Sequence, residues 1–376
     1  MSGAAHVTLR FRALDGWRGI CALLVAAHHI EAHGFLYWQP LIRNAWLFVD
    51  FFFVLSGFVI AHAYGEALAT APQVKIFAVR RVGRLWPLHV TMLAALVALE
   101  FSHLALAHWH PIAGERAAFT ADRSPIAILT NLSLVQSLGL HPYETWNGPA
   151  WSISTEFYTY LVFAGLCLAA RGRRLRFALS LVLALTGAAV LARFSRYGMR
   201  ETFDWGFFRC LYGFFAGVLA YEAWRRGWAS CLKGSAIEIA VLAAVVAFIT
   251  FVPGDRNAEY LATPLFAFAV LAFAGEGGVV SQILVLRPAA ALGRWSYSIY
   301  MVHTFVLAVL FSAIHMAELA FHRSWLVQVP DGNAVLALGW ADDPTMLAVL
   351  GAVVALAAFT WRHVERPGQR LFRPLK

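Results

Sequence analysis

The residues best suited to chemistry lie in apolar stretches, where polar groups are unfavourable. His29 follows Arg18 by roughly three helical turns in the segment 14–33, and a charged group at the centre of a bilayer costs about 2.5–3.5 kcal/mol on an insertion scale. At about 100° per residue these two side chains share one helix face, while His28 points aside. Histidine can take a proton from a hydroxyl near neutral pH. The spacing predicts a polar path along this face, with His29 as its reactive group.

Other apolar segments also carry polar residues that require an explanation. Glu156 lies two turns into the segment 149–170. A carboxylate at that depth needs a partner, and we interpret it as orienting a histidine or a substrate hydroxyl, with a structural ion pair as the alternative. Ser296, Tyr300 and His303 form a polar stripe that is either a packing seam or a pocket wall. The candidate substrate contacts are Asp15, Asp50, Trp151, Ser154, Tyr158 and His303.

Three arginines precede another apolar segment. Arg80, Arg81 and Arg84 lie within KIFAVRRVGRLWP, where residues 80 and 84 are one helical turn apart. Guanidinium forks bind phosphate oxygens well, so one hypothesis is an anion site. The alternative is the ordinary positive charge of a cytoplasmic loop beside an interfacial tryptophan.

The composition is that of a membrane protein. Of the 376 residues, 60% are hydrophobic and 14% are charged, with a mean hydropathy of +0.64, whereas soluble domains carry about 25% charged residues. Apolar runs extend over the whole chain, which favours one integral-membrane domain, residues 1–376, with no appended soluble domain. Basic cytoplasmic loops explain the net charge of +9, so we expect no nucleic-acid partner.

The apolar runs predict an all-α polytopic bundle of about ten membrane-spanning helices. A spanning helix needs about 20 mostly apolar residues. Ten spans place both termini on one side, and the excess of arginine and lysine in the loops on that side predicts that both termini are cytoplasmic. The more polar segment 124–141 is interpreted as interfacial or re-entrant. The predicted spans are 14–34, 46–65, 86–107, 149–170, 176–193, 206–224, 236–252, 260–275, 295–316 and 345–362.

Neither the cysteines nor the histidines have the spacing of a metal site. The four cysteines lie singly in or beside apolar runs, without disulfide or metal-ligand spacing. His103, His108 and His110 are scattered around a tryptophan, whereas zinc needs four ligands in a set arrangement. We therefore expect no metal and no permanently bound cofactor.

Six stretches of the chain together resemble acyltransferase family 3, the integral-membrane O-acyltransferases of bacteria. They occur in the family's order between residues 14 and 370, and each one alone is a weak signal. The six stretches are LDGWRGICALLVAAHH, VDFFFVLSGFVI, RRVGRLWP, PAWSISTEFY, GRWSYSIYMVH and WRHVERPGQR.

The resemblance implies a reaction. An acyl-CoA, usually acetyl-CoA, would bind from the cytoplasmic side of the bacterial inner membrane as the donor substrate. Its acyl group would pass to a hydroxyl of a saccharide, lipid-linked or other acceptor, often presented on the outer face, and membrane lipid would surround the protein. The family's essential histidine falls on His29, and its second acidic residue is replaced here by Phe157. The family's other site residues fall on Arg18, on Arg80 or Arg81, on Arg84, and on Ser154 and Glu156.

A proton-coupled transporter of a small solute is the alternative function. Histidine, glutamate and arginine within a membrane could form a proton relay. Transporters of this kind often contain two related halves with broken helices in matching positions, and this sequence has no such paired halves. The two classes differ in one simple property, because only the acyltransferase consumes acyl-CoA.

Overall fold

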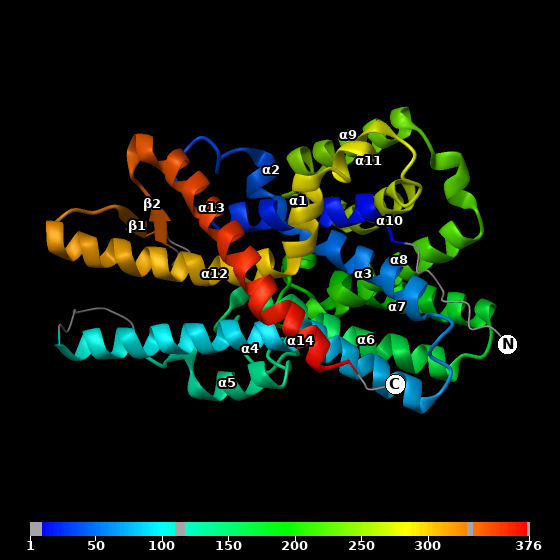
Figure 1. Ribbon diagram of the computed structural model, residues 1–376, viewed down its shortest axis with the longest axis horizontal. Helices are drawn as coiled ribbons and strands as arrows, with labels where there is room; N and C mark the ends of the chain where they lie inside the picture. The colour runs from blue at the N-terminus through cyan, green and yellow to red at the C-terminus, as the bar shows by residue number, and fades with distance from the viewer. Residues whose placement is uncertain (1–9, 110–116, 329–333, 374–376) are drawn as a thin grey trace.

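The protein is folded almost entirely into α-helices (Figure 1). The computed structural model describes residues 10–109, 117–328 and 334–373. The α-helices are α1 (Arg12–His28), α2 (Pro40–Arg43), α3 (Phe48–Tyr64), α4 (Ala71–Trp109), α5 (Pro125–Leu132), α6 (Trp151–Ala169), α7 (Arg173–Phe194), α8 (Gly206–Arg225), α9 (Ser235–Phe251), α10 (Ala262–Phe273), α11 (Val279–Leu284), α12 (Arg287–Phe321), α13 (Asp342–Thr360) and α14 (Arg366–Leu371).

Short elements complete the secondary structure. Strands β1 (Leu326–Gln328) and β2 (Ala334–Leu336) pair in antiparallel fashion, and a π-helical segment, Trp361–Glu365, links α13 to α14. Turns of 3₁₀ helix occupy Ala45–Leu47, Ala121–Arg123, Gly148–Ala150, Gly198–Arg200, Trp228–Leu232, Ala258–Leu261 and Gly339–Ala341.

A helix lies in every segment for which the sequence predicts a membrane span. In the described part of the chain, six helical segments are long and apolar enough to cross a bilayer, and α9 and α10 are apolar but shorter. The chain is therefore a helical integral membrane protein, as predicted. The total of ten spans and the cytoplasmic position of both termini stay predictions.

Several helix boundaries differ from the prediction, and those of α1 and α4 bear on the candidate site. α1 ends at His28 rather than near residue 34, with His29 at its C-cap. α4 continues for 39 residues, so the arginine-rich segment belongs to the spanning helix and Pro87 lies inside it.

Within 124–141 the only α-helix is α5, whose eight residues give about 12 Å of length. That is too short to cross a hydrocarbon layer of about 30 Å.

Glycines let α1 lie directly against α11 and the start of α12. A Cβ atom on Gly19 would collide with the backbone of Gly293, and one on Gly16 would collide with the carbonyl of Leu284. Small residues at such crossings let membrane helices approach closely. This contact fixes the position of Arg18, which directly precedes Gly19.

A second close crossing joins α3 to α8. A Cβ on Gly57 would collide with the carbonyl of Phe214, and a Cβ on Gly217 would collide with that of Val54. Gly57 therefore serves helix packing. The crossing brings two oppositely charged residues of the apolar helices together.

Asp50 of α3 and Arg209 of α8 form a buried ion pair beside this crossing. The Nε and Nη2 groups of Arg209 donate to the two carboxylate oxygens of Asp50 at 3.0 and 2.7 Å, and the two residues are 2% and 0% exposed. The guanidinium also stacks on the rings of Trp46 and Trp151. Asp50, predicted as a substrate contact, is instead one half of an internal ion pair.

Breaking this pair should strongly destabilise the protein. Asp50→Asn leaves the Arg209 charge buried without its counter-ion, a change worth about 3–5 kcal/mol. We expect a clearly lower temperature of unfolding in detergent, measured by size-exclusion chromatography after heating. The matched control is Arg173→Ala, because the Arg173–Glu66 pair is 65% and 62% exposed and contributes little. Equal melting of the Asp50→Asn and wild-type proteins would contradict the assignment.

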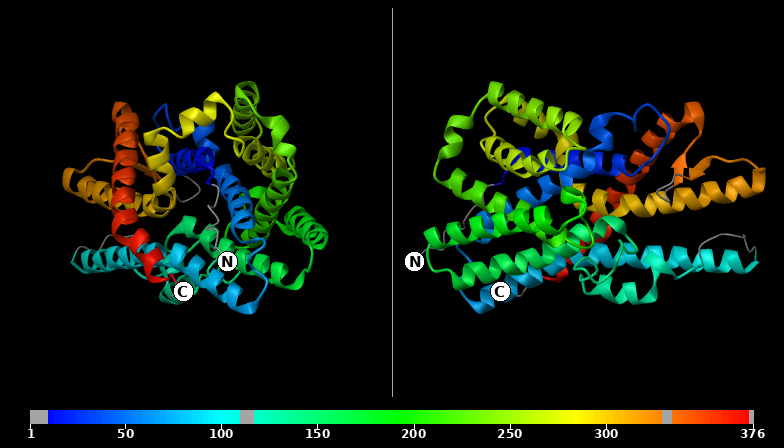
Figure 2. Two further views of the ribbon diagram at one scale, coloured as in Figure 1. Left: turned by 45° about the vertical axis from the view of Figure 1, so that its right-hand side comes forward. Right: turned by 180° about the vertical axis from the view of Figure 1, so that it is seen from behind.

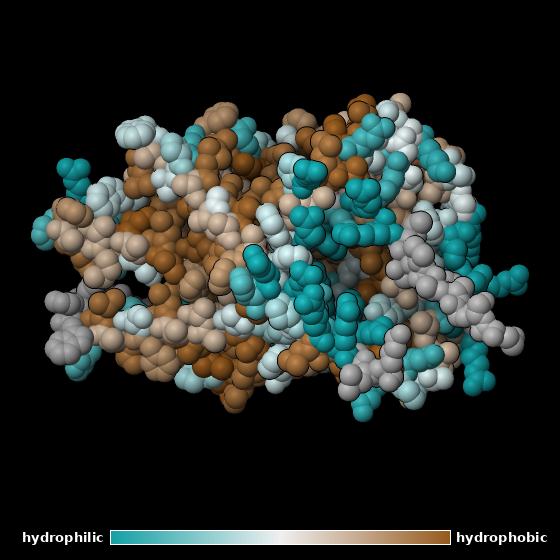
Figure 3. Space-filling view, in the orientation of Figure 1, coloured by the Kyte–Doolittle hydropathy of each residue, from teal (hydrophilic) through white to brown (hydrophobic). Residues whose placement is uncertain are grey.

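The two ends of the elongated molecule differ in character. α4 and α12 run alongside each other toward one end, while α7 to α10 gather toward the other (Figures 1 and 2). Apolar side chains dominate the surface over α12 and α13, and hydrophilic ones gather near α14 (Figure 3). The most apolar window of α12 is only 6% buried within the protein, so a lipid bilayer is the natural cover for this surface.

Candidate active site

A cavity of about 160 Å³ with apolar walls and several charged groups lies between α1, α3, α4, α6 and α12. Three guanidinium groups and one carboxylate line it, from Arg18, Arg81, Arg84 and Glu156. Guanidinium groups that face a cavity can bind an anion through charge-assisted hydrogen bonds. We call it the Arg84 cavity.

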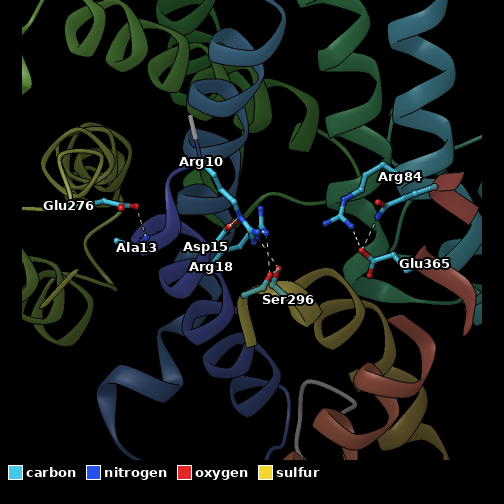
Figure 4. Close-up of polar contacts among 10 residues, drawn as sticks. Arg10, Ala13, Asp15, Arg18, Arg84, Glu276, Ser296 and Glu365 are labelled. Atoms are coloured by element: carbon cyan, nitrogen blue, oxygen red, sulfur yellow. Dashed lines mark hydrogen bonds and ion pairs between the residues drawn. The ribbon is translucent and has the colours of Figure 1, made fainter. Parts of the chain in front are cut away.

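Arg18 is held in this cavity by contacts from α1 and α12. Its Nε donates to Ser296 Oγ at 2.9 Å, and its Nη2 donates to the Gly293 carbonyl at 3.1 Å. Asp15 accepts from Nη2 at 3.0 Å and also pairs with Arg10 (Figure 4). Asp15, predicted as a substrate contact, therefore orients Arg18.

Arg84 is held by a carboxylate from the far end of the chain. It forms an ion pair with Glu365, which is 1% exposed (Figure 4). Ser298 Oγ donates to Glu365 Oε2 at 2.7 Å, and Gln369 Nε2 donates at 3.1 Å to Oε1, the oxygen that pairs with Arg84. The Arg84 guanidinium also lies over the Tyr297 ring. The π-helical segment that contains Glu365 thus supplies a counter-ion that our sequence analysis did not single out.

The other two arginines of the basic segment are separated by their helical phase. Arg81 lines the Arg84 cavity, where its guanidinium lies 5.5–5.8 Å from the rings of Tyr64, Phe77 and Tyr160. Its buried Nε has no hydrogen-bond partner among the described residues. Arg80 is exposed and does not line the cavity. The arginine pair of the cavity is therefore Arg81 and Arg84.

Glu156 lies in the Arg84 cavity rather than beside a histidine. Tyr160 donates its hydroxyl proton to Glu156 Oε1 at 2.6 Å, and Ser56 Oγ lies 2.9 Å from the same hydroxyl. In the described chain no hydrogen bond joins Glu156 to His29. The structure thus removes the predicted role of Glu156 in orienting a histidine and leaves its role toward a substrate open to test.

A second, larger cavity of about 380 Å³ lies at the C-terminal end of α1. His28 and His29 both line it, together with three arginines, Arg43, Arg200 and Arg209. We call it the His29 cavity. Its remaining lining residues include Tyr37, Asn44, Trp46, Glu144, Trp151 and Thr202.

His29 is oriented by the helix that it terminates. Its Nδ1 lies 2.8 Å from the Val25 carbonyl oxygen, and because a carbonyl can only accept, Nδ1 must donate. In the neutral imidazole this contact leaves the lone pair on Nε2. His29 can therefore accept a proton at Nε2 from a group bound in the cavity.

The two other histidines near His29 differ from their predicted positions. The His28 ring lies 5.1 Å from the His29 ring and lines the same cavity, although the helical phase points it toward a neighbouring helix. The His303 ring lies 4.8 Å from His29, but it is fully buried and lines neither cavity. His303 therefore lies behind the His29 ring, and its contact with a substrate stays a prediction.

The Arg84 cavity and the His29 cavity adjoin at Val49 and Tyr300, which line both. The Tyr300 hydroxyl donates to the Pro149 carbonyl and accepts from Ser152 Oγ, each at 2.9 Å. The predicted path along the α1 face is closed, because Ala22 and Val25 on that face are fully buried. The Arg84 cavity and the His29 cavity instead adjoin at the Tyr300 side chain.

Three further predicted contacts come from α6 and its neighbourhood. Trp151 lines the His29 cavity. Ser154 is fully buried and donates to the Leu134 carbonyl at 2.6 Å, and Tyr158 donates to the Ser133 carbonyl at 3.3 Å. Ser154 and Tyr158 line neither cavity, so they hold the loop before α6 in place.

His103 and His108, which the sequence does not predict to bind zinc, lie in the last two turns of α4. His110 lies outside the described residues. Among the described ones, no group of three or more His, Cys, Asp or Glu side chains is placed to hold a metal ion.

The fold and the two cavities define a class: a polytopic helical membrane protein with an arginine-lined space and a histidine-lined space that meet inside the bundle. The family model described as "Acyltransferase domain" matches residues 11–368. The chain therefore belongs to acyltransferase family 3 and is an O-acyltransferase. This membership decides against the transporter alternative.

Two curated proteins from rhizobia are similar to this chain. The exopolysaccharide production protein ExoZ of Rhizobium meliloti (strain 1021) is 27% identical over 332 residues, which cover 85% of this chain and 88% of that protein. Protein 2 in the picA locus of Rhizobium radiobacter is 34% identical over 163 residues, covering 41% of this chain and 81% of that protein. No solved structure matches.

Proposed function

We propose that the protein transfers an acyl group, in the first instance acetyl, from acyl-CoA to a hydroxyl group of a saccharide acceptor. The observation that carries the proposal is the meeting of the Arg84 cavity and the His29 cavity at Tyr300 in a member of an O-acyltransferase family. Donor and acceptor could then approach from separate openings and meet at one place.

The Arg84 cavity suits the donor. Coenzyme A carries phosphate groups, which guanidinium groups bind through charge-assisted hydrogen bonds. The Arg18 and Arg84 side chains are 31% and 26% exposed, so phosphates can reach them from outside. The narrow interior, walled by Phe52, Leu55 and Val59, suits the thioester arm and limits its contact with water.

The His29 cavity suits the acceptor. His29 Nε2 removes the hydroxyl proton while the acceptor oxygen attacks the thioester carbonyl carbon, the carbon–sulfur bond breaks, and the coenzyme A thiolate leaves and takes up a proton. The alternative is that Nε2 first carries the acyl group and then passes it to the hydroxyl. Both routes use the same imidazole nitrogen and the same tautomer.

The membrane orientation that fits this reaction places the Arg84 cavity on the cytoplasmic side of the bacterial inner membrane. Both ends of the described chain lie at this cavity: Arg10 pairs with Asp15 beside Arg18, and Phe372 packs on Gly83, next to Arg84. Acyl-CoA is a cytoplasmic metabolite, so the proposed donor site and both termini belong on that side.

The saccharide class of the acceptor is supported by the relative named for exopolysaccharide production. The test is a reaction in detergent with the purified protein, labelled acetyl-CoA and the envelope glycan fraction of a strain that lacks the gene. We expect labelled ester that mild alkali releases. Binding of acetyl-CoA without any ester on the glycan would contradict the assignment of a saccharide acceptor. Absence of acetyl-CoA binding would contradict the assignment of the donor.

The topology can be tested by cysteine labelling. Cys21, Cys167 and Cys210 are buried and Cys231 is exposed, so Cys231→Ser provides a background without an exposed native thiol. A cysteine at position 70 should react only after the membrane is permeabilised, and one at position 120 should react in intact spheroplasts. The reverse pattern would place the Arg84 cavity outside the cytoplasm.

A further inference from the structure

The His29 cavity has more positive than negative charge on its walls. Three arginines line it, and Glu144 is the only carboxylate among its described lining residues. A saccharide without charge would need no such excess. Whether each arginine has a carboxylate partner within the protein therefore indicates whether the cavity can bind an anion.

Arg209 does not contribute to the excess. It is 2% exposed, and both oxygens of Asp50 accept from it at 2.7 and 3.0 Å. A buried guanidinium with a bidentate carboxylate partner is compensated. It lines the cavity as a compensated charge.

Arg200 is only partly compensated. Its nearest carboxylate oxygen, on Glu259, lies 3.6 Å away, which is beyond hydrogen-bond distance. The Glu259 carboxylate already accepts a hydrogen bond from the backbone N–H of Gly254 at 3.0 Å. The Arg200 side chain is 52% exposed and its guanidinium stacks on Trp46 at 4.9 Å. Its N–H donors thus remain available at the mouth of the cavity.

Arg43 is not compensated by any carboxylate of the described chain within 4.0 Å. Its guanidinium lies 4.5 Å from the centre of the Trp38 ring. Arg43 is the last residue of α2, and its side chain is exposed. Stacking on an aromatic ring holds a guanidinium plane while leaving its edge free to bind a carboxylate or phosphate.

Glu144 can offset at most one of these charges. It is the one carboxylate among the described lining residues of this cavity, and burial raises the pKa of its carboxyl group against the opposing effects of Thr202 and Arg209. Tyr37, Trp46 and Trp151 add aromatic surface that can cover the apolar faces of sugar rings. The cavity therefore combines aromatic walls, a proton acceptor and a cationic mouth.

We propose that the acceptor is an anionic saccharide, and that Arg43 and Arg200 bind its carboxylate or phosphate while the hydroxyl reaches His29. The inference rests on the proposed function, because it concerns the acceptor of the same reaction. The charge comes either from a uronic acid or other acidic substituent on the sugar, or from a phosphate that links the sugar to a carrier.

The experiment modifies the acceptor and the arginines separately. The glycan fraction from a strain without the gene is used untreated, after reduction of its carboxyl groups to alcohols, and after enzymatic removal of its accessible phosphates. Purified full-length protein in nanodiscs of zwitterionic lipid receives labelled acetyl-CoA, and ester formation is measured. We expect a loss of tenfold or more after one of the treatments, and the treatment that causes the loss identifies the source of the charge.

Variants connect this sensitivity to the cavity mouth. The double variant Arg43→Met/Arg200→Met should esterify the untreated glycan about tenfold more slowly and respond little to either treatment, with unchanged acetyl-CoA affinity. Arg43→Lys should retain most of the sensitivity because it keeps the charge. The matched control is Arg196→Met, which removes an exposed arginine that lines neither cavity and should behave as wild type.

Two results would overturn the inference while leaving the proposed function intact. One is equal esterification of all three glycan samples by the wild-type protein. The other is a double variant that loses rate equally on treated and untreated glycan. Absence of ester on the untreated glycan, in contrast, would contradict the proposed function, which assigns a saccharide as the acceptor.

Discussion

The His29→Ala variant should form ester at least 100-fold more slowly than the wild-type protein. The imidazole is the proposed proton acceptor in the His29 cavity, and loss of such a base is worth roughly 10²–10⁴-fold. The affinity for acetyl-CoA should be unchanged, because Arg18, Arg81 and Arg84 are untouched. The measurement is ester formed per mole of folded protein, with donor affinity measured by calorimetry on the same sample.

His28→Ala is the comparison variant for this test. His28 lines the His29 cavity but lies to the side of the His29 ring, so we expect most of kcat to remain and the KM for the acceptor to rise by a few fold. Equal losses of kcat in the two variants would show that the chemistry does not depend on His29 alone. Near-normal turnover by His29→Ala would remove His29 from the mechanism.

Arg84→Ala should weaken acyl-CoA binding by roughly 10- to 100-fold, since a hydrogen bond to a charged group contributes about 1.5–3 kcal/mol. Arg84→Lys should recover only part of this affinity, because lysine lacks the planar fork. Arg80→Ala is the matched control: Arg80 lies one turn away on α4, is exposed and does not line the Arg84 cavity. Calorimetry with acetyl-CoA gives all three dissociation constants.

Glu365 should act through Arg84 as a positioning residue. Glu365→Gln removes the counter-ion but keeps the hydrogen-bonding shape toward Ser298, so we expect weaker acetyl-CoA binding and nearly normal kcat at saturating donor. Combining it with Arg84→Ala should add little, because the two side chains form one unit. Additive losses in the double variant, or a loss confined to kcat, would contradict the positioning role.

The helices of this protein could be predicted because each one is a long apolar run. Arg18, Arg84 and Glu156 could also be recognised as unusual, since charged groups in such runs must turn away from lipid. The structure brings these three residues to one cavity. His29 was recognised for the same reason, and it lines a different cavity.

The partners of these residues could not be predicted from one sequence. Glu365 pairs with Arg84 across 281 positions, and Asp50 pairs with Arg209 across 159. No local sequence pattern can indicate a pairing between residues that lie so far apart in the chain. Arg81 rather than Arg80 lines the cavity because the packing of α4 sets its rotation. The His29 cavity is also lined by Arg43, the last residue of α2, which follows the end of α1 at His28.

The most direct test of the account is mass spectrometry of envelope glycans from three matched strains, with the wild-type gene, without the gene, and with His29→Ala at normal membrane level. We expect alkali-labile ester groups on the glycan of the first strain and their loss from the other two. Identical glycan masses in the strains with and without the gene would contradict the proposed transfer to an envelope saccharide.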